Sequence, residues 1–141
     1  MRARASIHID REPAVVFDRL ADFGTHSSWR PEVLSSQVIG EVARGSRVMQ
    51  RVSLQGHGGL LDLEITEFVP PERISFRARG GTRARGGFRL EPENGGTRVN
   101  ISATVQLNGS ASLAEDRIRE AAEANARQSL TRLKSQLESG R

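Results

Sequence analysis

The sequence contains no cysteine among its 141 residues. This absence excludes disulfide bonds, metal sites built from thiolates and cysteine nucleophiles. It fits a reducing compartment, and we expect the protein to be cytoplasmic. Long apolar runs are also missing, and none follows the basic start at residues 1–5. The sequence therefore predicts neither a signal peptide nor a membrane span.

Tyrosine is absent as well, and Lys134 is the only lysine among 21 basic side chains. Few groups can therefore lose a proton between the pKa of histidine and that of arginine, which explains a pI near 11.1 at a net charge of only +4. Aromatic residues make up 4% of the chain, too few for a base-stacking platform, and no nucleic-acid-binding motif is present. We therefore expect no nucleic acid partner.

The apolar residues that are present follow two periods along the chain. The length fits one domain, residues 1–141, and a chain of this size buries roughly 70% of its unfolded surface. Residues 2–9 alternate apolar and polar side chains, which predicts a half-buried strand. One or two short helices are expected next. The first has Asp10 as its cap, Pro13 in its first turn and its end near residues 22–24, and residues 25–33 could hold the second.

From residue 34 onward the apolar period is two, which predicts about six further antiparallel strands. Asn94-Gly95 is a strong hairpin signal, and residues 55–59 read as a flexible hairpin loop. Gly86-Gly87 interrupts a strand and indicates either a bulge or a close approach of two backbones. The predicted class is α+β, with the helices on one face of a curved antiparallel sheet of about seven strands.

The last part of the chain predicts a long helix whose apolar stripe is made of small residues in its first half. The sequence Ser112-x-x-Glu115 has the pattern of a capping box at its start. The stripe consists of Ile118, Ala122, Ala126, Leu130, Leu133 and Leu137, and Asn125, Ser129 and Gln136 fall within the same arc. Small side chains over a sheet leave volume between the two layers, and we interpret that volume as a pocket.

The order and spacing of several motifs resemble the START-like (SRPBCC) superfamily and its polyketide cyclase/dehydrase branch. The matching pieces are Pro13-Ala14-Val15-Val16-Phe17 with Asp22, Trp29-Arg30-Pro31, Gly40 with Gly45, Leu63-Glu64-Ile65-Thr66-Glu67 running into Pro70-Pro71-Glu72-Arg73-Ile74, Gly95-Gly96-Thr97-Arg98-Val99 and the closing helix. The resemblance implies a helix-grip fold, in which a sheet wraps the last helix around a cavity. Members include lipid carriers, ligand binders and polyketide aromatase/cyclases, so the fold does not fix the function.

The inward positions of these elements give the candidate ligand-binding residues. They are Trp29, Gln50, Val52, Leu63, Ile65, Phe76, Phe88, Ile101, Ala122, Asn125, Ala126 and Ser129. The three polar ones, Gln50, Asn125 and Ser129, could orient a carbonyl or hydroxyl of a ligand, or could bond to the backbone or to trapped water. Trp29 suits either a core anchor or a pocket wall.

Two residues are candidates for acid–base chemistry. Glu67 is in phase with apolar positions of its strand, so it is either a pocket carboxylate or a strand-end residue paired with Arg73. His26 lies near Trp29, in a segment that could border the pocket mouth. The other histidines, His8 and His57, are expected at the surface, and no spacing typical of a metal site is present.

Arginine dominates the strands, nearly always out of phase with the apolar residues. We expect these side chains on a solvated outer face, with an acidic partner or a membrane surface as the alternative. Arg51 and Arg89 are the first to test. The set is Arg47, Arg51, Arg77, Arg79, Arg83, Arg85, Arg89 and Arg98.

Three functions remain open at this point. The first is the binding of a hydrophobic small molecule, such as a lipid, polyketide or isoprenoid, in the cavity between sheet and helix. The second is a polyketide cyclase/dehydrase that acts on a poly-ketone there. The third is an interaction module that uses the arginine-rich face. We expect no metal and no cofactor, and the sequence predicts neither the ligand's identity nor the oligomeric state.

Overall fold

The computed structural model of the protein describes residues 1–54, 56–80 and 83–139. A strand is followed by two short helical segments, six strands, one helical turn and a long helix. In chain order these are β1 (Arg2–Ile9), α1 (Pro13–Ala21), the 3-10 helix η1 (Phe23–Ser28), β2 (Val33–Ile39), β3 (Arg47–Leu54), β4 (His57–Val69), β5 (Arg73–Ala78), β6 (Ala84–Glu93), β7 (Gly96–Val105), α2 (Ser110–Leu113) and α3 (Glu115–Glu138).

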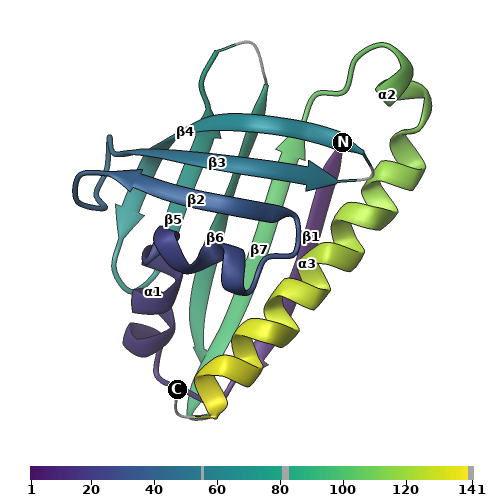
Figure 1. Ribbon diagram of the computed structural model, residues 1–141. Coiled ribbons are helices and arrows are strands. Elements are labelled where there is room, and N and C mark those ends of the chain that lie inside the picture. The colour runs from purple at the N-terminus through teal and green to yellow at the C-terminus, as the bar shows by residue number, and fades with distance from the viewer. Residues whose placement is uncertain (55, 81–82, 140–141) are drawn as a thin grey trace.

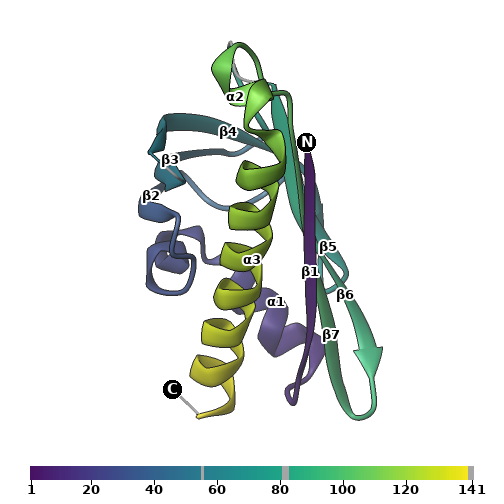
Figure 2. The same cartoon turned by 90° about the vertical axis from the view of Figure 1, so that its right-hand side faces the viewer.

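The strands form one antiparallel sheet in the order β1-β7-β6-β5-β4-β3-β2. The sheet is strongly curved, so that β2, β3 and β4 run across the direction of β5, β6 and β7 (Figure 1). Helix α3 lies within the curve, alongside β1, and no element covers the opposite face of β1, β7 and β6 in Figure 2. This arrangement confirms the predicted class and the helix-grip fold.

The tightest hairpin joins β6 to β7 at Asn94-Gly95, as predicted. Both residues have positive φ, 47° and 79°, which is the conformation of a two-residue turn that matches the twist of the strands. The predicted loop at residues 55–59 is wrong for Gly58 and Gly59, which pair with β3 as part of β4. A Cβ on Gly58 would lie 2.2 Å from the carbonyl oxygen of Val52, so glycine allows this close approach. Gln55 and the side chain of His57 lie outside the described residues.

The irregularity expected at Gly86-Gly87 occurs on another strand. Both glycines keep regular register with β5 and β7, and the bulge lies on β4, between Ile65 and Glu67. The close approach is confirmed, because a Cβ on Gly87 would lie 2.5 Å from the carbonyl oxygen of Ile74. Of the two alternatives that the sequence offered at these glycines, the close approach is therefore the one that occurs.

Neither predicted helix cap is formed. Helix α3 begins after Ala114 without a side-chain cap, and the hydroxyl of Ser112 donates to the carbonyl oxygen of Gly109. The reason is that the separate turn α2 precedes α3 and engages Ser112. Helix α1 has Pro13 in its first turn, but Glu12 rather than Asp10 is its N-cap residue. The backbone N–H of Asp10 instead donates to the carboxylate of Glu138 at the end of α3, 2.8 Å away.

The core fills the end of the molecule where α1, η1 and the last turns of α3 meet the sheet. Its largest fully buried side chains include Trp29, Phe23, Phe88, Leu130 and Leu133. Aromatic rings contact one another throughout this cluster, for example Phe23 with Phe76 and Trp29 with Phe88. Among the described residues, no helix is long and apolar enough to cross a membrane.

Candidate functional site

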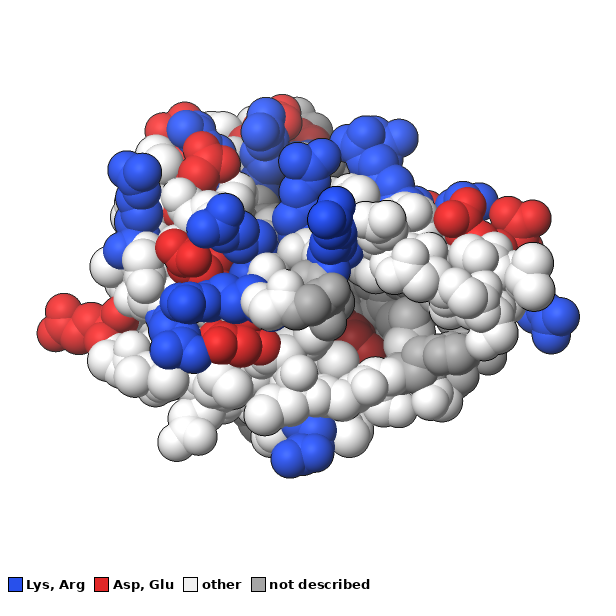
Figure 3. Space-filling view, turned by 90° about the horizontal axis from the view of Figure 1, so that it is seen from above, with Lys and Arg blue, Asp and Glu red and all other residues white. Residues whose placement is uncertain are grey.

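A cavity of about 220 Å³ lies between the sheet and the first half of α3. Its walls are mostly apolar and come from both ends of the chain and from the middle strands. The lining residues are Met1, Ala3, Arg30, Glu32, Val52, Leu54, Leu61, Phe76, Ile101, Ser102, Ala103, Val105, Ala122, Asn125 and Ala126. Viewed from above, the molecule is hollowed beside a border of largely uncharged residues, whereas Lys and Arg gather on one side (Figure 3).

The cavity exists because of the small side chains on one stretch of α3. Ala122, Asn125 and Ala126 face the sheet where the cavity lies. One turn later Ser129 and Leu130 are buried, followed by Leu133 and Leu137. The leucines fill the space that the alanines leave open, because each carries three more carbon atoms. The transition from alanine to leucine along the stripe therefore marks the end of the cavity.

The structure places half of the candidate ligand-binding residues in this lining. They are Val52, Phe76, Ile101, Ala122, Asn125 and Ala126. The others are buried but do not line the cavity: Trp29, Gln50, Leu63, Ile65, Phe88 and Ser129. Sequence periodicity identified the inward face correctly but gave no information on where along that face the interior is filled.

The polar candidates have different surroundings. The amide of Gln50 donates to the hydroxyl of Ser36 at 3.1 Å. The hydroxyl of Ser129 donates to the backbone carbonyl of Asn125 at 2.8 Å. The side-chain amide of Asn125 has no hydrogen-bond partner within the described part of the chain, and it borders the cavity. Asn125 is thus the neutral polar group best placed to meet a ligand.

His26 is a core residue and not a pocket group. It is fully buried and stacks on Phe23 with ring centroids 4.3 Å apart. Its Nε2 donates to the carbonyl oxygen of Leu20 at 2.8 Å, and its Nδ1 accepts from Arg30 at 3.2 Å. Burial, with the nearby Arg30 charge, lowers its pKa from 6.5 to about 3. A neutral imidazole with both nitrogens engaged is unsuited to acid–base chemistry.

Glu67 lies on the outer face of the sheet, away from the cavity. The bulge after Ile65 shifts the alternation, so that Phe68 turns inward and contacts Phe17, with ring centroids 5.4 Å apart. The carboxylate of Glu67 accepts hydrogen bonds from Ser75 at 2.8 Å and from Arg73 at 3.0 Å. These contacts, that of Ser75 foremost, lower its pKa. The strand-end interpretation was the right one.

Trp29 anchors the core between η1 and β2. Its ring is fully buried, and its Nε1–H has no hydrogen-bond partner in the described residues. The ring packs edge-on against His26 with centroids 4.9 Å apart. It therefore forms part of the filled core rather than of the cavity wall.

The sequence analysis did not single out the two charged residues of the cavity, Arg30 and Glu32. The Nε of Arg30 donates to Oε1 of Glu32 at 3.0 Å, and its Nη1 contacts Nδ1 of His26. The Oε2 of Glu32 is buried and has no hydrogen-bond partner among the described residues. The available signal was the Trp29-Arg30-Pro31 motif, which was noted only as part of the resemblance.

Chemically, the site combines an apolar wall with one ion pair and one amide. Apolar walls exclude water and strengthen the interaction of any bound polar group with Arg30, Glu32 and Asn125. Within the described residues, no group of three His, Cys, Asp or Glu side chains could hold a metal ion. The arrangement suits an apolar ligand with a few oxygen atoms.

Comparison with known proteins agrees with this architecture. Residues 1–138 match the model of the family described as polyketide cyclase / dehydrase and lipid transport. No curated protein matches the chain closely enough to count as a relative.

Solved structures of similar proteins share the fold at low sequence identity. TTHA0849 from Thermus thermophilus has a TM-score of 0.86 at 21% identity, with 99% of each chain covered. A START superfamily protein from Mycobacterium smegmatis has a TM-score of 0.79 at 13% identity, again with 99% of each chain covered. The Zhui aromatase/cyclase from Streptomyces sp. R1128 has a TM-score of 0.77 at 16% identity, covering 98% of this chain and 93% of its own. By its sequence match over nearly the whole length and by its helix-grip architecture, the chain belongs to the polyketide cyclase/dehydrase and lipid transport family.

Proposed function

We propose that the protein binds a small hydrophobic molecule carrying at least one oxygen in the cavity between the sheet and the first half of α3. The observation that carries this proposal is the apolar cavity opposite Ala122 and Ala126. Burial of apolar ligand surface contributes about 25 cal/mol per Å², from which the cost of association is subtracted. The free amide of Asn125 and the Arg30–Glu32 pair then select for oxygen atoms at fixed places.

The cavity size restricts the class of ligand. An apolar cavity of roughly 150 Å³ holds a benzene molecule, so about 220 Å³ accommodates one or two rings or a short branched chain. A longer lipid, isoprenoid or poly-ketone chain requires α3 to move outward, or part of the ligand to remain outside the cavity.

The experiment fills the cavity with a side chain. Wild-type protein is titrated with the uncharged fluorescent probe N-phenyl-1-naphthylamine, and ligands that copurify are sought by native mass spectrometry. The variant Ala126→Leu should weaken probe binding about tenfold or more, because leucine occupies the same space. Ala124→Leu, at an exposed position of the same helix, is the matched control and should bind like wild type. Equal binding by both variants, or none by wild type, would refute the proposal.

A second candidate function is cyclisation of a poly-ketone, which the Arg30–Glu32 pair at the cavity wall favours. Arg30 would donate a hydrogen bond to a ketone oxygen, and the Glu32 carboxylate would accept a proton from the carbon between two ketones. The resulting enolate carbon would bond to a second carbonyl carbon, whose oxygen takes the proton back from Glu32 and becomes a hydroxyl. Glu32 would then accept the second proton of the attacking carbon and pass it to that hydroxyl, which leaves as water while a carbon–carbon double bond forms. Glu67, His26 and Gln50 are poorly placed for these roles, since none of them lines the cavity.

This candidate is tested by the turnover of a model poly-ketone. Glu32→Gln removes the base while keeping the shape, and should abolish turnover without changing probe binding. Glu67→Gln, on the outer face, is the control and should turn over like wild type. Unchanged turnover in Glu32→Gln would leave ligand binding as the function.

A further inference from the structure

The outer face of β1, β7, β6 and β5 carries a furrow, on the side of the sheet opposite the cavity. The register places Ser102, Gly87 and Ser75 side by side on neighbouring strands, facing outward. These three small residues form the floor. Gly87 cannot be replaced without strain, because an added Cβ would lie 2.5 Å from the carbonyl oxygen of Ile74. The close approach of the two backbones therefore keeps this position of the furrow free of a side chain.

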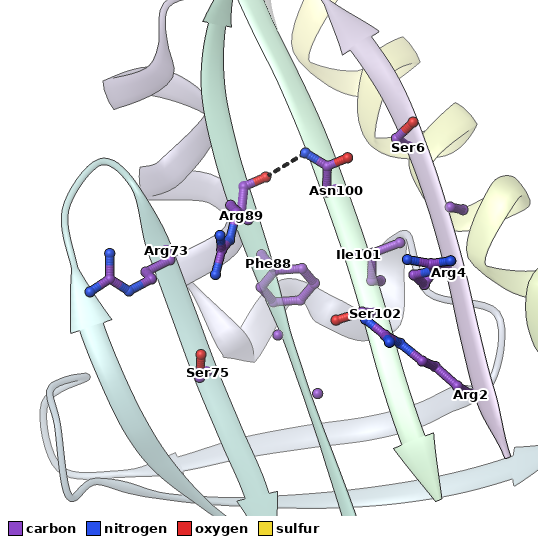
Figure 4. Close-up of a pocket in the computed structure, with 13 residues that line it drawn as sticks. Arg2, Arg4, Ser6, Arg73, Ser75, Phe88, Arg89, Asn100, Ile101 and Ser102 are labelled. Atoms are coloured by element: carbon purple, nitrogen blue, oxygen red, sulfur yellow. Dashed lines mark hydrogen bonds between the residues drawn. The ribbon is translucent and has the colours of Figure 1, made fainter.

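Arginines stand on both sides of this floor. The next outward-facing row of the sheet on one side of the floor consists of Arg2, Thr104, Arg85 and Arg77, which the register aligns on neighbouring strands. The next outward-facing row on the other side contains Asn100, Arg89 and Arg73. Arg4, opposite Ser102, borders the end of the floor at β1. In Figure 4, the side chain of Arg2 extends from β1 toward Ser102 on β7, while Arg89 on β6 and Arg73 on β5 lie on the other side of the floor.

Most of these positive charges are not neutralised by the fold. Arg73 pairs with Glu67 at 3.0 Å, and Arg77 pairs with Glu64 at 3.3 Å. The side chains of Arg2, Arg4, Arg85 and Arg89 make no hydrogen bond or ion pair within the part of the chain that the structure describes, although the charge of Arg89 helps to lower the pKa of Glu67. Moreover, Arg85 lies directly opposite Arg77, and Arg89 directly opposite Arg73. Like charges in such cross-strand pairs repel each other and destabilise a sheet. An anion bound in the furrow would reduce this repulsion.

We propose that this furrow binds a small soluble molecule bearing phosphate groups. Its two adjoining hollows measure about 600 Å³ and 520 Å³ and share Arg2, Ser75 and Ser102, a size that suits a small ligand. Guanidinium groups bind phosphate oxygens in bidentate fashion, and the hydroxyl of Ser102 is free to donate within the described residues. The Glu67 carboxylate at the β4 end repels anions, so phosphate binds toward β6, β7 and β1.

The composition of this face argues against a membrane surface as the occupant. Among the described residues, the large exposed apolar side chains are Val15, Leu34, Ile39, Leu60 and Leu113. They belong to α1, β2, β4 and α2, and none belongs to the four strands of the furrow. Outward positions around the floor carry arginine, serine, asparagine and threonine, which offer nothing to insert among lipid chains.

The test measures pyrophosphate binding by calorimetry and by the shift in melting temperature at low salt. Wild type should bind and melt at a higher temperature with pyrophosphate, and the double variant Arg85→Gln/Arg89→Gln should bind at least about tenfold more weakly. Without pyrophosphate this variant should melt close to wild type, since the loss of two like-charge contacts offsets the loss of the attraction between Arg89 and Glu67. Arg51→Gln is the matched control, because Arg51 is exposed on the outer face of β3 and lies outside the furrow. Control binding should equal that of wild type.

Three outcomes would overturn the proposal. They are absence of pyrophosphate binding by wild type, equal weakening in Arg51→Gln, and binding of anionic phosphatidylglycerol vesicles without binding of pyrophosphate. The last result would assign the face to a membrane. Uncharged N-phenyl-1-naphthylamine serves as an independent readout, because the double variant should still bind it in the cavity. Failure of the furrow and failure of the cavity are therefore distinguishable.

Discussion

The two halves of the interior are enclosed by the same helix and the same sheet, yet one is hollow and the other is filled. Around Ala122 and Ala126 the space between the layers stays open. Around Leu130 and Leu133 it is closed by leucine from the helix and by aromatic rings from η1 and the strands. The backbone of α3 is a continuous helix across both halves. Side-chain volume along the stripe therefore decides where this fold can hold a guest.

The largest expected effect comes from opening the filled half. Leu133 is fully buried, so Leu133→Ala removes three carbons where nothing can take their place. We expect a loss of about 2–5 kcal/mol in the free energy of unfolding, measured by urea denaturation. A loss below about 1 kcal/mol would mean that this half is not packed as described.

The next effect tests the polar group inside the filled half. Because burial lowers the pKa of His26 from 6.5 to about 3, the unfolded chain binds more protons between these values. The contribution of neutral His26 to the free energy of unfolding is fully present above pH 6.5 and is lost as the pH falls toward 3. At about pH 5 the loss is about 2 kcal/mol, since each unit contributes about 1.4 kcal/mol.

Urea unfolding of wild type and His26→Gln across this range provides the measurement. Glutamine does not titrate, so the variant should show a flatter profile between about pH 6.5 and 5. The carboxylates with lowered pKa values, such as Glu67 and Glu138, act below this window, from their usual value of 4.5 downward. Identical slopes for the two proteins would contradict the assignment.

A smaller effect locates the border between the halves. Ser129 is fully buried at the start of the filled part, so Ser129→Leu forces extra atoms into occupied space. We expect a cost of about 1–3 kcal/mol in unfolding free energy. Ser129→Ala is the control, and its change should be well under half of that cost. If Ser129→Leu is tolerated, the interior around Ser129 is not filled and the cavity extends along α3 past this residue.

The smallest effect is expected in the hollow half, and with the opposite sign. Ala126→Leu adds the same side chain one turn earlier, into the cavity. Full burial of three carbons would contribute about 2.4 kcal/mol at about 0.8 kcal/mol each, and strain together with the exposure that remains in the open cavity should reduce the gain to about 1 kcal/mol. Thermal melting of the ligand-free form is the readout. A marked loss of stability would show that no usable space exists there.

Much of the fold was predictable because its signals are local. The alternation in residues 2–9, the turn at Asn94-Gly95 and the stripe of α3 each depend on neighbours within a few residues. The wrong predictions share another cause, namely a competing local arrangement. The capping motif at Ser112 was displaced by the turn α2, and the phase of Glu67 was changed by the bulge on β4.

The candidate site was predictable where its residues lie on periodic elements, as Val52, Phe76 and Ile101 do on the strands. The helical period predicts that Ala122, Asn125 and Ala126 face the sheet. Arg30 and Glu32, in contrast, come from the segment between η1 and β2. That segment has no period from which an inward direction can be derived. The register of the sheet likewise brings Arg2 on β1 into line with Arg85 on β6, although the two residues are distant in sequence.

The sequence by itself determined the class of fold, the faces of the strands and the place along α3 where side chains are too small to fill the interior. These properties depend on periodicity and side-chain volume, both of which are written in consecutive residues. Only the tertiary structure decided that an ion pair borders the cavity, that His26 is held neutral and that unneutralised arginines share one furrow. Such properties depend on strand order, register and burial, which bring together charges that lie far apart along the chain.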